Sequence, residues 1–151
     1  METPEIIRNL AALRLEEAQI LARNGKPDGA FYLAGYSVEL ALKAKVAERL
    51  GLPGIFDEQN TAQQFTGLNE LRRLVKTHNL TLLLVMSGLK PAFDQLRITD
   101  VRFATVANWL NDWNEGLRYR SPGSVTSTGV AHFIVSLAET NGILQWIERH
   151  S

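Results

Sequence analysis

The sequence predicts an all-α protein, an up-and-down bundle of four to five helices that forms one domain over residues 1–151. Apolar residues recur at the three- and four-residue spacings of helices over long stretches, and no stretch shows the sustained alternation of a strand. Hydrophobic content of 45% and charged content of 21% are typical of a soluble globular chain, and this length suffices for one core.

The first helix is predicted to start at Pro4, because the Thr3 hydroxyl can cap a helix and proline suits the first helical position. Its apolar residues recur at helical spacing: Ile6, Leu10, Leu13 and Ala18. The pattern stops at "RNGKPDG" (23–29), where glycine and proline interrupt it. A second helix is predicted over 28–50, ended by "GLPG" (51–54).

The middle of the chain predicts a long loop and two shorter helices. "IFDEQNTAQQFTG" (55–67) is polar and bounded by glycine, which indicates a loop. A helix resumes in "LNELRRLVK" (68–76). Thr77 or Asn79 in "THNL" is then expected to cap "LTLLLVMSG" (80–88).

The last third predicts two more long helices. A short helix follows Pro91, and "TDVRFATVANWLNDWNEGLRY" (99–119) has helical periodicity behind a capping residue. "RSPGS" (120–124) predicts a turn before a final amphipathic helix over 125–149. The core stripe of that helix is Val130, Phe133, Ile134, Leu137, Leu144 and Ile147. Four long helices with short accessory turns result.

Composition excludes several classes of function. Lys+Arg and Asp+Glu both total 16, so a nucleic acid would have to be met by a local basic patch. The absence of cysteine excludes disulfides, thiol catalysis and cysteine-based zinc sites. The three histidines are scattered, and no P-loop, dinucleotide glycine motif, nucleophile elbow or HExxH is present, so we expect no metal and no cofactor. No apolar run has signal-peptide or membrane-spanning length, so we expect a cytoplasmic protein with no membrane partner.

Two charges interrupt "FYLAGYSVELALKAK" (31–45), a helix that is otherwise apolar almost all round. Glu39 and Lys43 are one turn apart, with the acid nearer the N-terminus. One interpretation is an ion pair on an exposed stripe, worth less than about 1 kcal/mol. The other is a polar seam that faces a groove and meets charges from another helix. Gly35 favours a close approach at this point, and Tyr36 adds a hydroxyl nearby.

Basic residues precede a histidine in "LRRLVKTHNL" (71–80). One interpretation is a solvated helix face followed by a capping histidine. In the other, Arg73 and His78 act together on a phosphate, because arginine binds phosphate oxygens through a planar fork and histidine can move a proton near neutral pH. Such a pair could promote attack of an RNA 2′-hydroxyl on its neighbouring phosphate without a metal ion.

A third polar group follows two tryptophans in "NWLNDWNEGLRYRSPG" (108–123). Trp109 and Trp113 are four residues apart, a spacing typical of a core face. Arg118, Tyr119 and Arg120 lie at the predicted helix end, where cations complement the helix dipole. A ligand-binding role for Arg118 requires its side chain to point back into the bundle.

These motifs resemble the HEPN family of small prokaryotic helical bundles. The resemblance is carried by "YLAGYSVELALKA" after an amphipathic first helix, then "THNL", then "LRY" before a long final helix. It covers nearly the whole chain and implies a four- to five-helix bundle that forms a homodimer. Many members are metal-independent endoribonucleases with an R-x4-6-H motif in the groove between protomers. Members often act in toxin–antitoxin and phage-defence systems beside a nucleotidyltransferase partner.

The chain departs from that motif in one respect. After "LRYR" no histidine falls at the required spacing, whereas Arg73 and His78 match R-x4-H by count at an earlier place in the chain. We therefore expect His78 as the acid/base, with Arg73 or Arg118 steadying the phosphate. The remaining residues expected to contact an RNA or nucleotide ligand are Glu39, Lys43, Tyr36, Tyr119 and Arg120.

Three functions follow as alternatives. The first is a metal-independent endoribonuclease of toxin or defence type. The second is a non-catalytic HEPN-like module that dimerises, binds RNA or a nucleotide and partners a nucleotidyltransferase. The third is a plain oligomeric protein in which the polar seam only fixes helix register.

Overall fold

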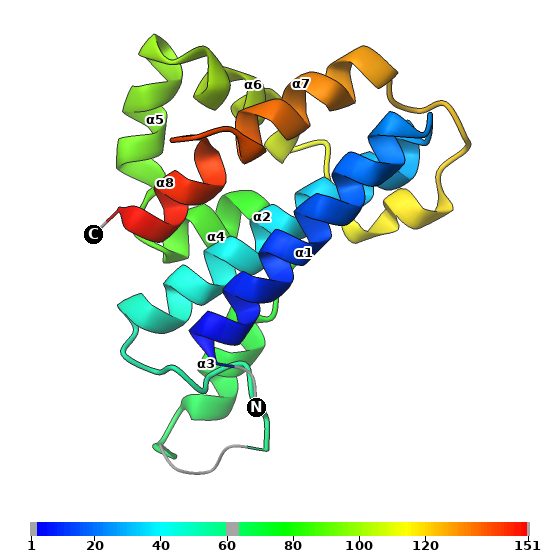
Figure 1. The fold of residues 1–151 in the computed structure, drawn as a ribbon. Helices are drawn as coiled ribbons and strands as arrows, with labels where there is room; N and C mark the ends of the chain where they lie inside the picture. The colour runs from blue at the N-terminus through cyan, green and yellow to red at the C-terminus, as the bar shows by residue number, and fades with distance from the viewer. Residues whose placement is uncertain (1–2, 60–63, 151) are drawn as a thin grey trace.

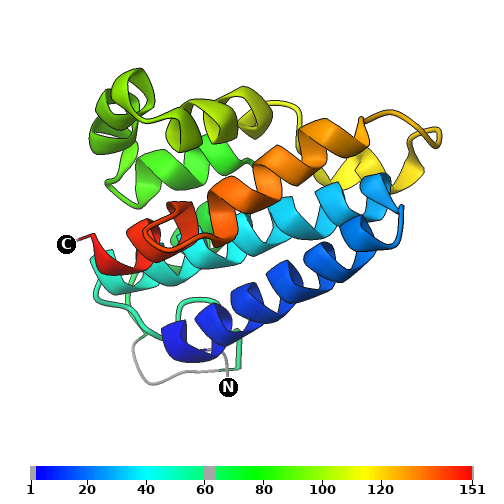
Figure 2. The same ribbon diagram turned by 45° about the horizontal axis from the view of Figure 1, so that its top comes forward.

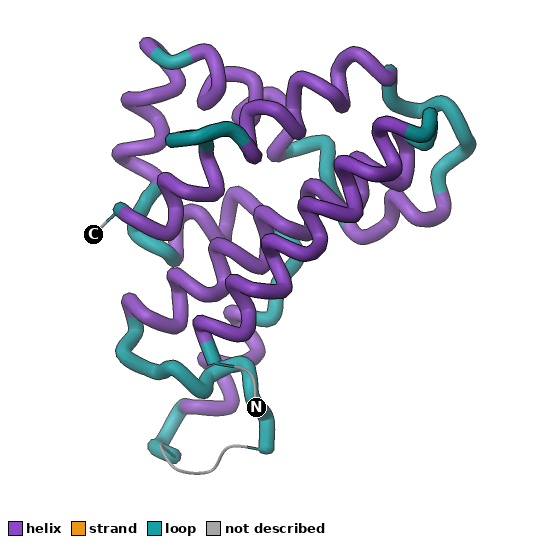
Figure 3. Tube along the Cα trace, viewed as in Figure 1, coloured by secondary structure: helices purple, strands orange, loops and turns teal. Residues whose placement is uncertain are grey.

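A computed structural model describes residues 3–59 and 64–150, with all of their side chains except those of Glu115 and Arg118. In these residues the protein is all-helical. Figure 3 traces only helices and loops through this part of the chain. In chain order the helices are α1 (Pro4–Arg23), α2 (Pro27–Arg49), α3 (Leu68–Val75), α4 (Leu80–Met86), α5 (Lys90–Thr99), α6 (Val101–Leu110), the 3-10 helix η1 (Glu115–Tyr119), α7 (Ser127–Ala138) and α8 (Ile143–Arg149). The predicted all-α class is confirmed.

The two long helices, α1 and α2, lie antiparallel and side by side over their whole lengths (Figure 1). The Thr3 hydroxyl accepts a 3.3 Å hydrogen bond from the backbone N–H of Ile6, as expected for the cap of α1. Gly25, with φ of 71°, provides the left-handed residue of the short turn between the helices. An ion pair between Arg8 and Glu48 joins the other end of the pair.

α2 is the central helix of the molecule. Figure 2 shows it between α1 on one side and α4, α7 and α8 on the other. Phe31 is fully buried against the rings of Trp109 and Phe133, at centroid distances of 4.8 and 5.6 Å. A Cβ on Gly35 would lie 2.1 Å from the Trp113 indole, so only glycine admits the ring. The glycine thus has the packing reason expected of it, but the group that approaches is a tryptophan ring between α6 and η1 and not the helix expected from the sequence.

The predicted helix over 99–119 is wrong in its second half. α6 begins behind the Asp100 cap and ends at Leu110, and η1 follows after a turn. Asn114 accepts a 2.8 Å hydrogen bond from the N–H of Gly116 and so starts η1. Asparagine and aspartate side chains compete with the helix for backbone hydrogen bonds, which explains the break in "NDWN".

The predicted helix over 125–149 is also wrong, because it is broken into α7 and α8. Asn141 adopts φ of 60°, and a Cβ on Gly142 would lie 2.7 Å from the Glu139 carbonyl oxygen. The chain turns sharply here, at a place where glycine fits and a larger residue does not. The expectation of four long helices fails as well, since α1 and α2 have 20 and 23 residues whereas α3 to α8 have 7 to 12.

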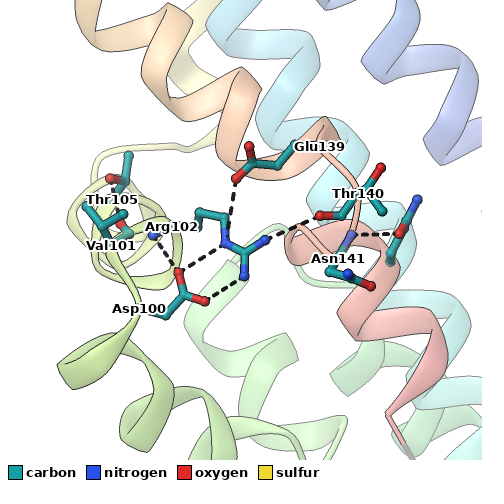
Figure 4. Close-up of polar contacts among 8 residues, drawn as sticks. Asp100, Val101, Arg102, Thr105, Glu139, Thr140 and Asn141 are labelled. Carbon is teal, nitrogen blue, oxygen red and sulfur yellow. Dashed lines mark hydrogen bonds and ion pairs between the residues drawn. The ribbon is translucent and has the colours of Figure 1, made fainter.

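A polar cluster joins the break between α7 and α8 to the start of α6 (Figure 4). The Arg102 guanidinium donates to both carboxylate oxygens of Asp100, at 3.1 and 2.7 Å, and to the carbonyl of Thr140 at 3.4 Å. Glu139 completes the cluster at 3.6 Å. These hydrogen bonds hold the pKa of Asp100 below its ordinary value.

The C-terminal helix is held by a buried lysine of α2. The Lys45 ammonium donates to the carbonyls of Glu148 and His150, at 3.0 and 2.9 Å, and so caps the last turn of α8. Burial lowers the pKa of Lys45, and the nearby guanidinium groups of Arg8 and Arg49 lower it further. Within the described residues no helix is long and apolar enough to span a membrane.

The predicted 55–67 loop is present in its described parts, 55–59 and 64–67; residues 60–63 lie outside the described chain. Arg72 of α3 donates to the carbonyls of Ile55 and Asp57, at 3.1 and 3.2 Å. The first part of the loop is thereby fixed to α3, and its Phe56 ring lies beside Lys43 of α2.

Candidate functional site

A buried carboxylate in the middle of α2 organises the candidate site. Glu39 is 1% exposed, and one of its carboxylate oxygens lies 2.7 Å from Nδ1 of His78. The other oxygen accepts a 3.2 Å hydrogen bond from the Lys43 ammonium. Burial strongly disfavours a carboxylate without partners. Lys43 and His78 supply the partners that Glu39 needs.

The short connection between α3 and α4 places His78 over this carboxylate. Asn79 accepts a 3.0 Å hydrogen bond from the N–H of Leu82 and so caps α4. Thr77 in turn accepts a 3.1 Å hydrogen bond from the N–H of Asn79. Both residues proposed as caps from the sequence thus take part in the turn, and they orient the histidine between them.

A groove with a volume of about 610 Å³ opens where His78 meets α2. We call it the histidine groove; it is lined by Ile7, Leu10, Tyr36, Glu39, Leu40, Lys43, Phe56, Asp57, Glu58, Gln59, Lys76 and His78. The His78 side chain is 43% exposed, so its ring is accessible from the groove although the carboxylate beneath it is buried.

Both acidic and basic side chains line this groove. The Lys43 ammonium lies 5.7 Å from the centroid of the Phe56 ring and is 13% exposed. Lys76 forms an ion pair with Glu58 at the outer edge, where the two side chains are 41% and 65% exposed. A pair this exposed contributes less than about 1 kcal/mol, so either charge can change partners at low cost.

The contact between Glu39 and His78 defines what the histidine can do. A carboxylate accepts a hydrogen bond and does not donate one, so the ring nitrogen facing it carries the hydrogen. That fixes the ring orientation and the tautomer, and it assigns any proton transfer to the other ring nitrogen, Nε2. The arrangement is that of a positioned general acid/base with an ammonium group nearby.

His78 also borders a second groove, with a volume of about 470 Å³. We call it the asparagine groove; it is lined by Lys76, Thr77, His78, Asn79, Leu80, Leu110, Asn111, Trp113 and Asn114. The walls come from the α3–α4 connection and from the segment between α6 and η1. The two grooves have two lining residues in common, Lys76 and His78. His78 therefore lies between the grooves and borders both.

Four of the residues predicted from the sequence come together. Glu39, Lys43, Tyr36 and His78 all line the histidine groove. The interpretation of Glu39 and Lys43 as an exposed ion pair is wrong, because the Glu39 carboxylate is buried. It also contacts His78, which lies in the connection between α3 and α4. Tyr36 stacks on Tyr32 with ring centroids 6.5 Å apart.

The other predicted residues do not join this group. Arg73 is exposed and lines a separate depression beside Gly67 and Leu68, so the R-x4-H spacing does not bring its side chain into the histidine groove. Tyr119 is 83% exposed at the end of η1, and Arg120 follows it; neither lines either groove. The side chain of Arg118 lies outside the described residues.

Several groove residues were given no site role from the sequence. Lys76 lies beside His78 in both grooves, while Phe56 and Glu58 belong to a segment predicted only as loop. Asn111 and Asn114 carried a signal, since asparagines that interrupt a helical pattern mark caps and turns. In the described part of the chain no group of three or more histidine, aspartate and glutamate side chains is placed to hold a metal ion.

Comparison with known proteins gives no further assignment for this geometry. No family model, curated protein or solved structure matches the chain.

Proposed function

We propose that the histidine groove binds RNA and cleaves its backbone without a metal ion, with His78 moving the proton. The observation that carries the proposal is the 2.7 Å contact between His78 Nδ1 and the buried carboxylate of Glu39. A half-exposed imidazole oriented by a buried acid beside two ammonium groups suits general base catalysis at a phosphodiester. The resemblance to the HEPN family in "YLAGYSVELALKA" and "THNL" supports the same chemistry.

The proposed reaction is an internal transesterification. The 2′-oxygen attacks the neighbouring phosphorus, the O2′–P bond forms and the P–O5′ bond breaks. His78 takes the proton of the 2′-hydroxyl, and the departing 5′-oxygen receives a proton from water. The products are a 2′,3′-cyclic phosphate and a 5′-hydroxyl, and general base catalysis of this kind contributes about 10²–10⁴-fold to the rate.

Lysines take the role that the sequence suggested for Arg73. Lys43 lies at the base of the groove and Lys76 at its edge, so both ammonium groups can approach a phosphate held at His78. Positive charge placed where negative charge develops lowers the barrier of such a step. Arg118, the arginine of "LRY", is kept in the proposal as a residue that steadies the phosphate. Unchanged RNA binding and cleavage by Arg118→Ala would remove it.

The proposed molecule is a homodimer. α1 carries a stripe of exposed apolar side chains that are 39% to 45% exposed: Ile6, Leu10, Leu13 and Ile20. Leu10 also lines the histidine groove, so a second protomer seated on this stripe would reach the edge of the groove. This stripe also favours the second candidate function, a non-catalytic module of toxin–antitoxin or defence type that binds a nucleotidyltransferase partner.

The experiment is incubation of the purified protein with end-labelled tRNA and total RNA in the presence of EDTA. Wild type is compared with His78→Ala and with His132→Ala, since both histidines are exposed. His78→Ala also removes one partner of the buried Glu39 carboxylate, so thermal unfolding is measured to verify that this variant is folded. We expect wild type and His132→Ala to produce fragments with cyclic phosphate ends and His78→Ala to produce none. Equal cleavage by all three would reject His78, and binding without cleavage by all three would favour the partner module.

A further inference from the structure

The asparagine groove offers mainly hydrogen-bond donors to a ligand. Asn79 accepts from the N–H of Leu82 at 3.0 Å, and Asn114 accepts from the N–H of Gly116 at 2.8 Å. A backbone N–H can only donate, so the amide oxygen of each asparagine faces the backbone and the NH₂ group faces away from it. These contacts fix the amide orientation by chemistry.

The other polar side chains of this groove follow the same pattern. Thr77 uses its oxygen to accept from the N–H of Asn79, which leaves its hydroxyl hydrogen to donate. The amide oxygen of Asn111 accepts a 3.3 Å hydrogen bond from the hydroxyl of Thr81. The ammonium group of Lys76 can only donate hydrogen bonds. Among the described residues no carboxylate lines this groove, in contrast to the histidine groove.

Buried apolar side chains lie behind these polar groups. Leu80, Leu110 and Trp113 line the groove but are only 1%, 9% and 3% exposed. A base bound here would meet mainly the polar side chains, with its edge toward the donors. Because His78 borders both grooves, a phosphate held at His78 brings the base of an adjoining nucleotide to the asparagine groove.

We propose that the asparagine groove binds an RNA base next to the phosphate at His78, and that it prefers bases with a carbonyl oxygen at position 4 of a pyrimidine or position 6 of a purine (uracil and guanine) over bases with an amino group there (cytosine and adenine). The inference rests on the proposed function, because it takes RNA as the ligand. Uracil carries a carbonyl oxygen where cytosine carries an amino group, and guanine carries one where adenine carries an amino group. A wall of donors can donate hydrogen bonds to that carbonyl oxygen, whereas it offers no acceptor to an amino group.

The test uses octamers of 2′-O-methyl uridine and 2′-O-methyl cytidine, which cannot be cleaved by 2′-oxygen attack, with affinity measured by fluorescence anisotropy. We expect wild type to prefer the uridine octamer about tenfold, the discrimination typical of one good base-edge contact. The variants are Asn79→Asp and Asn114→Asp. Aspartate caps a helix as well as asparagine does, so each keeps its bond to the backbone and replaces only the NH₂ group with oxygen.

Asn9→Asp provides the matched control, because Asn9 is exposed on α1 and lines neither groove. It adds the same negative charge and should weaken both octamers equally, so that the tenfold ratio is kept. In Asn79→Asp and Asn114→Asp the ratio should fall to about one, since a carboxylate accepts from the cytosine amino group. Thermal unfolding should leave all three variants folded.

Each outcome decides the proposal. A uridine preference that is lost in the two groove variants and kept in Asn9→Asp supports it. Equal affinity of wild type for both octamers overturns the base site while RNA binding stands. A preference that persists in both groove variants overturns it as well, because the selectivity then arises elsewhere. No binding of either octamer at low salt removes the proposed RNA function together with the base site.

Discussion

The carboxylate of Glu39 is 1% exposed, yet it lies 2.7 Å from the ring of His78, a side chain that is 43% exposed. The contact joins the interior of the bundle to its surface through one hydrogen bond. An exposed histidine would otherwise sample several rotamers, and this one is oriented by a group that cannot itself reach solvent. The orientation of His78 therefore depends on the packing of α2.

Replacement of Glu39 by glutamine should lower the free energy of unfolding by about 1–3 kcal/mol, because the lysine ammonium and the histidine ring lose a charged acceptor. Urea denaturation measures the change. The matched variant is Lys43→Met, and the double variant completes a cycle that isolates the coupling of the pair. Strictly additive effects would show that Glu39 and Lys43 do not stabilise each other.

Replacement of Gly35 by alanine should destabilise the protein by about 1–3 kcal/mol, although alanine is the better helix former, because the new methyl group would overlap the Trp113 indole. Gly29→Ala is the control in the same helix. Its methyl group would lie 3.3 Å from the flexible end of Leu21, so we expect little change or a slight gain. Equal midpoints in urea for both variants would contradict the role given to the indole.

The Asp100–Arg102 contact should make stability depend on pH in the acid range. The folded pKa of Asp100 lies below its ordinary value of 3.8, so the carboxylate stabilises the fold above that pH and loses its contribution as pH falls through the folded pKa. An asparagine side chain at this position would keep the cap without the charge, so Asp100→Asn should be less stable than wild type at pH 6 and closer to it at pH 3. A difference that does not change with pH would exclude the carboxylate as its source.

Replacement of Lys45 by methionine should loosen α8 in particular, because the carbonyls of Glu148 and His150 lose their donor while the apolar stem of the side chain is kept. Hydrogen exchange followed by NMR should show faster exchange in α8 and little change in α1. Lys90→Met is the control, since Lys90 forms only an exposed ion pair with Asp94. Uniform acceleration over all helices would indicate global destabilisation instead.

Replacement of Glu58 by glutamine should increase the affinity of the histidine groove for RNA, because Lys76 then loses the carboxylate that competes with phosphate. The gain should be largest at low salt, as screening weakens phosphate contacts. Asp94→Asn removes an equal charge from a similar ion pair outside both grooves and should have a smaller effect. Equal gains would mean that net charge alone is responsible. Thermal unfolding should be unchanged in both.

Local signals in the sequence predicted the long helices well. Thr3 and Pro4 start α1 as expected, and the predicted 28–50 helix differs from α2 by one residue at each end. Caps and proline act through the backbone within one turn, so their effect does not require knowledge of the tertiary fold. The polar seam expected at Glu39 and Lys43 is also found, since Glu39 meets His78 beyond its own helix, whereas the R-x4-H spacing does not bring Arg73 into the same groove.

The breaks in the last third could not be predicted from apolar periodicity. The stripe of 125–149 continues from α7 into α8, because both helices cover the same core while the chain turns between them. "TNG" at 140–142 was the available signal, since Asn-Gly favours a turn. The grooves could not be predicted from local patterns, because Asn79 and Asn114 line the same groove only through the packing of α4 and η1 on α2.

His78 stands on a four-residue corner between helices of eight and seven residues, α3 and α4. Helices this short are unstable alone in water, so the corner depends on the burial of Leu68 and Val75 of α3 and of Leu80, Leu83 and Leu84 of α4 in the folded protein. A chain in which α3 and α4 are not yet packed should therefore lack the site, even where α1 and α2 are already paired. The contact between His78 and Glu39 is thus a property of the complete fold and not of any one helix.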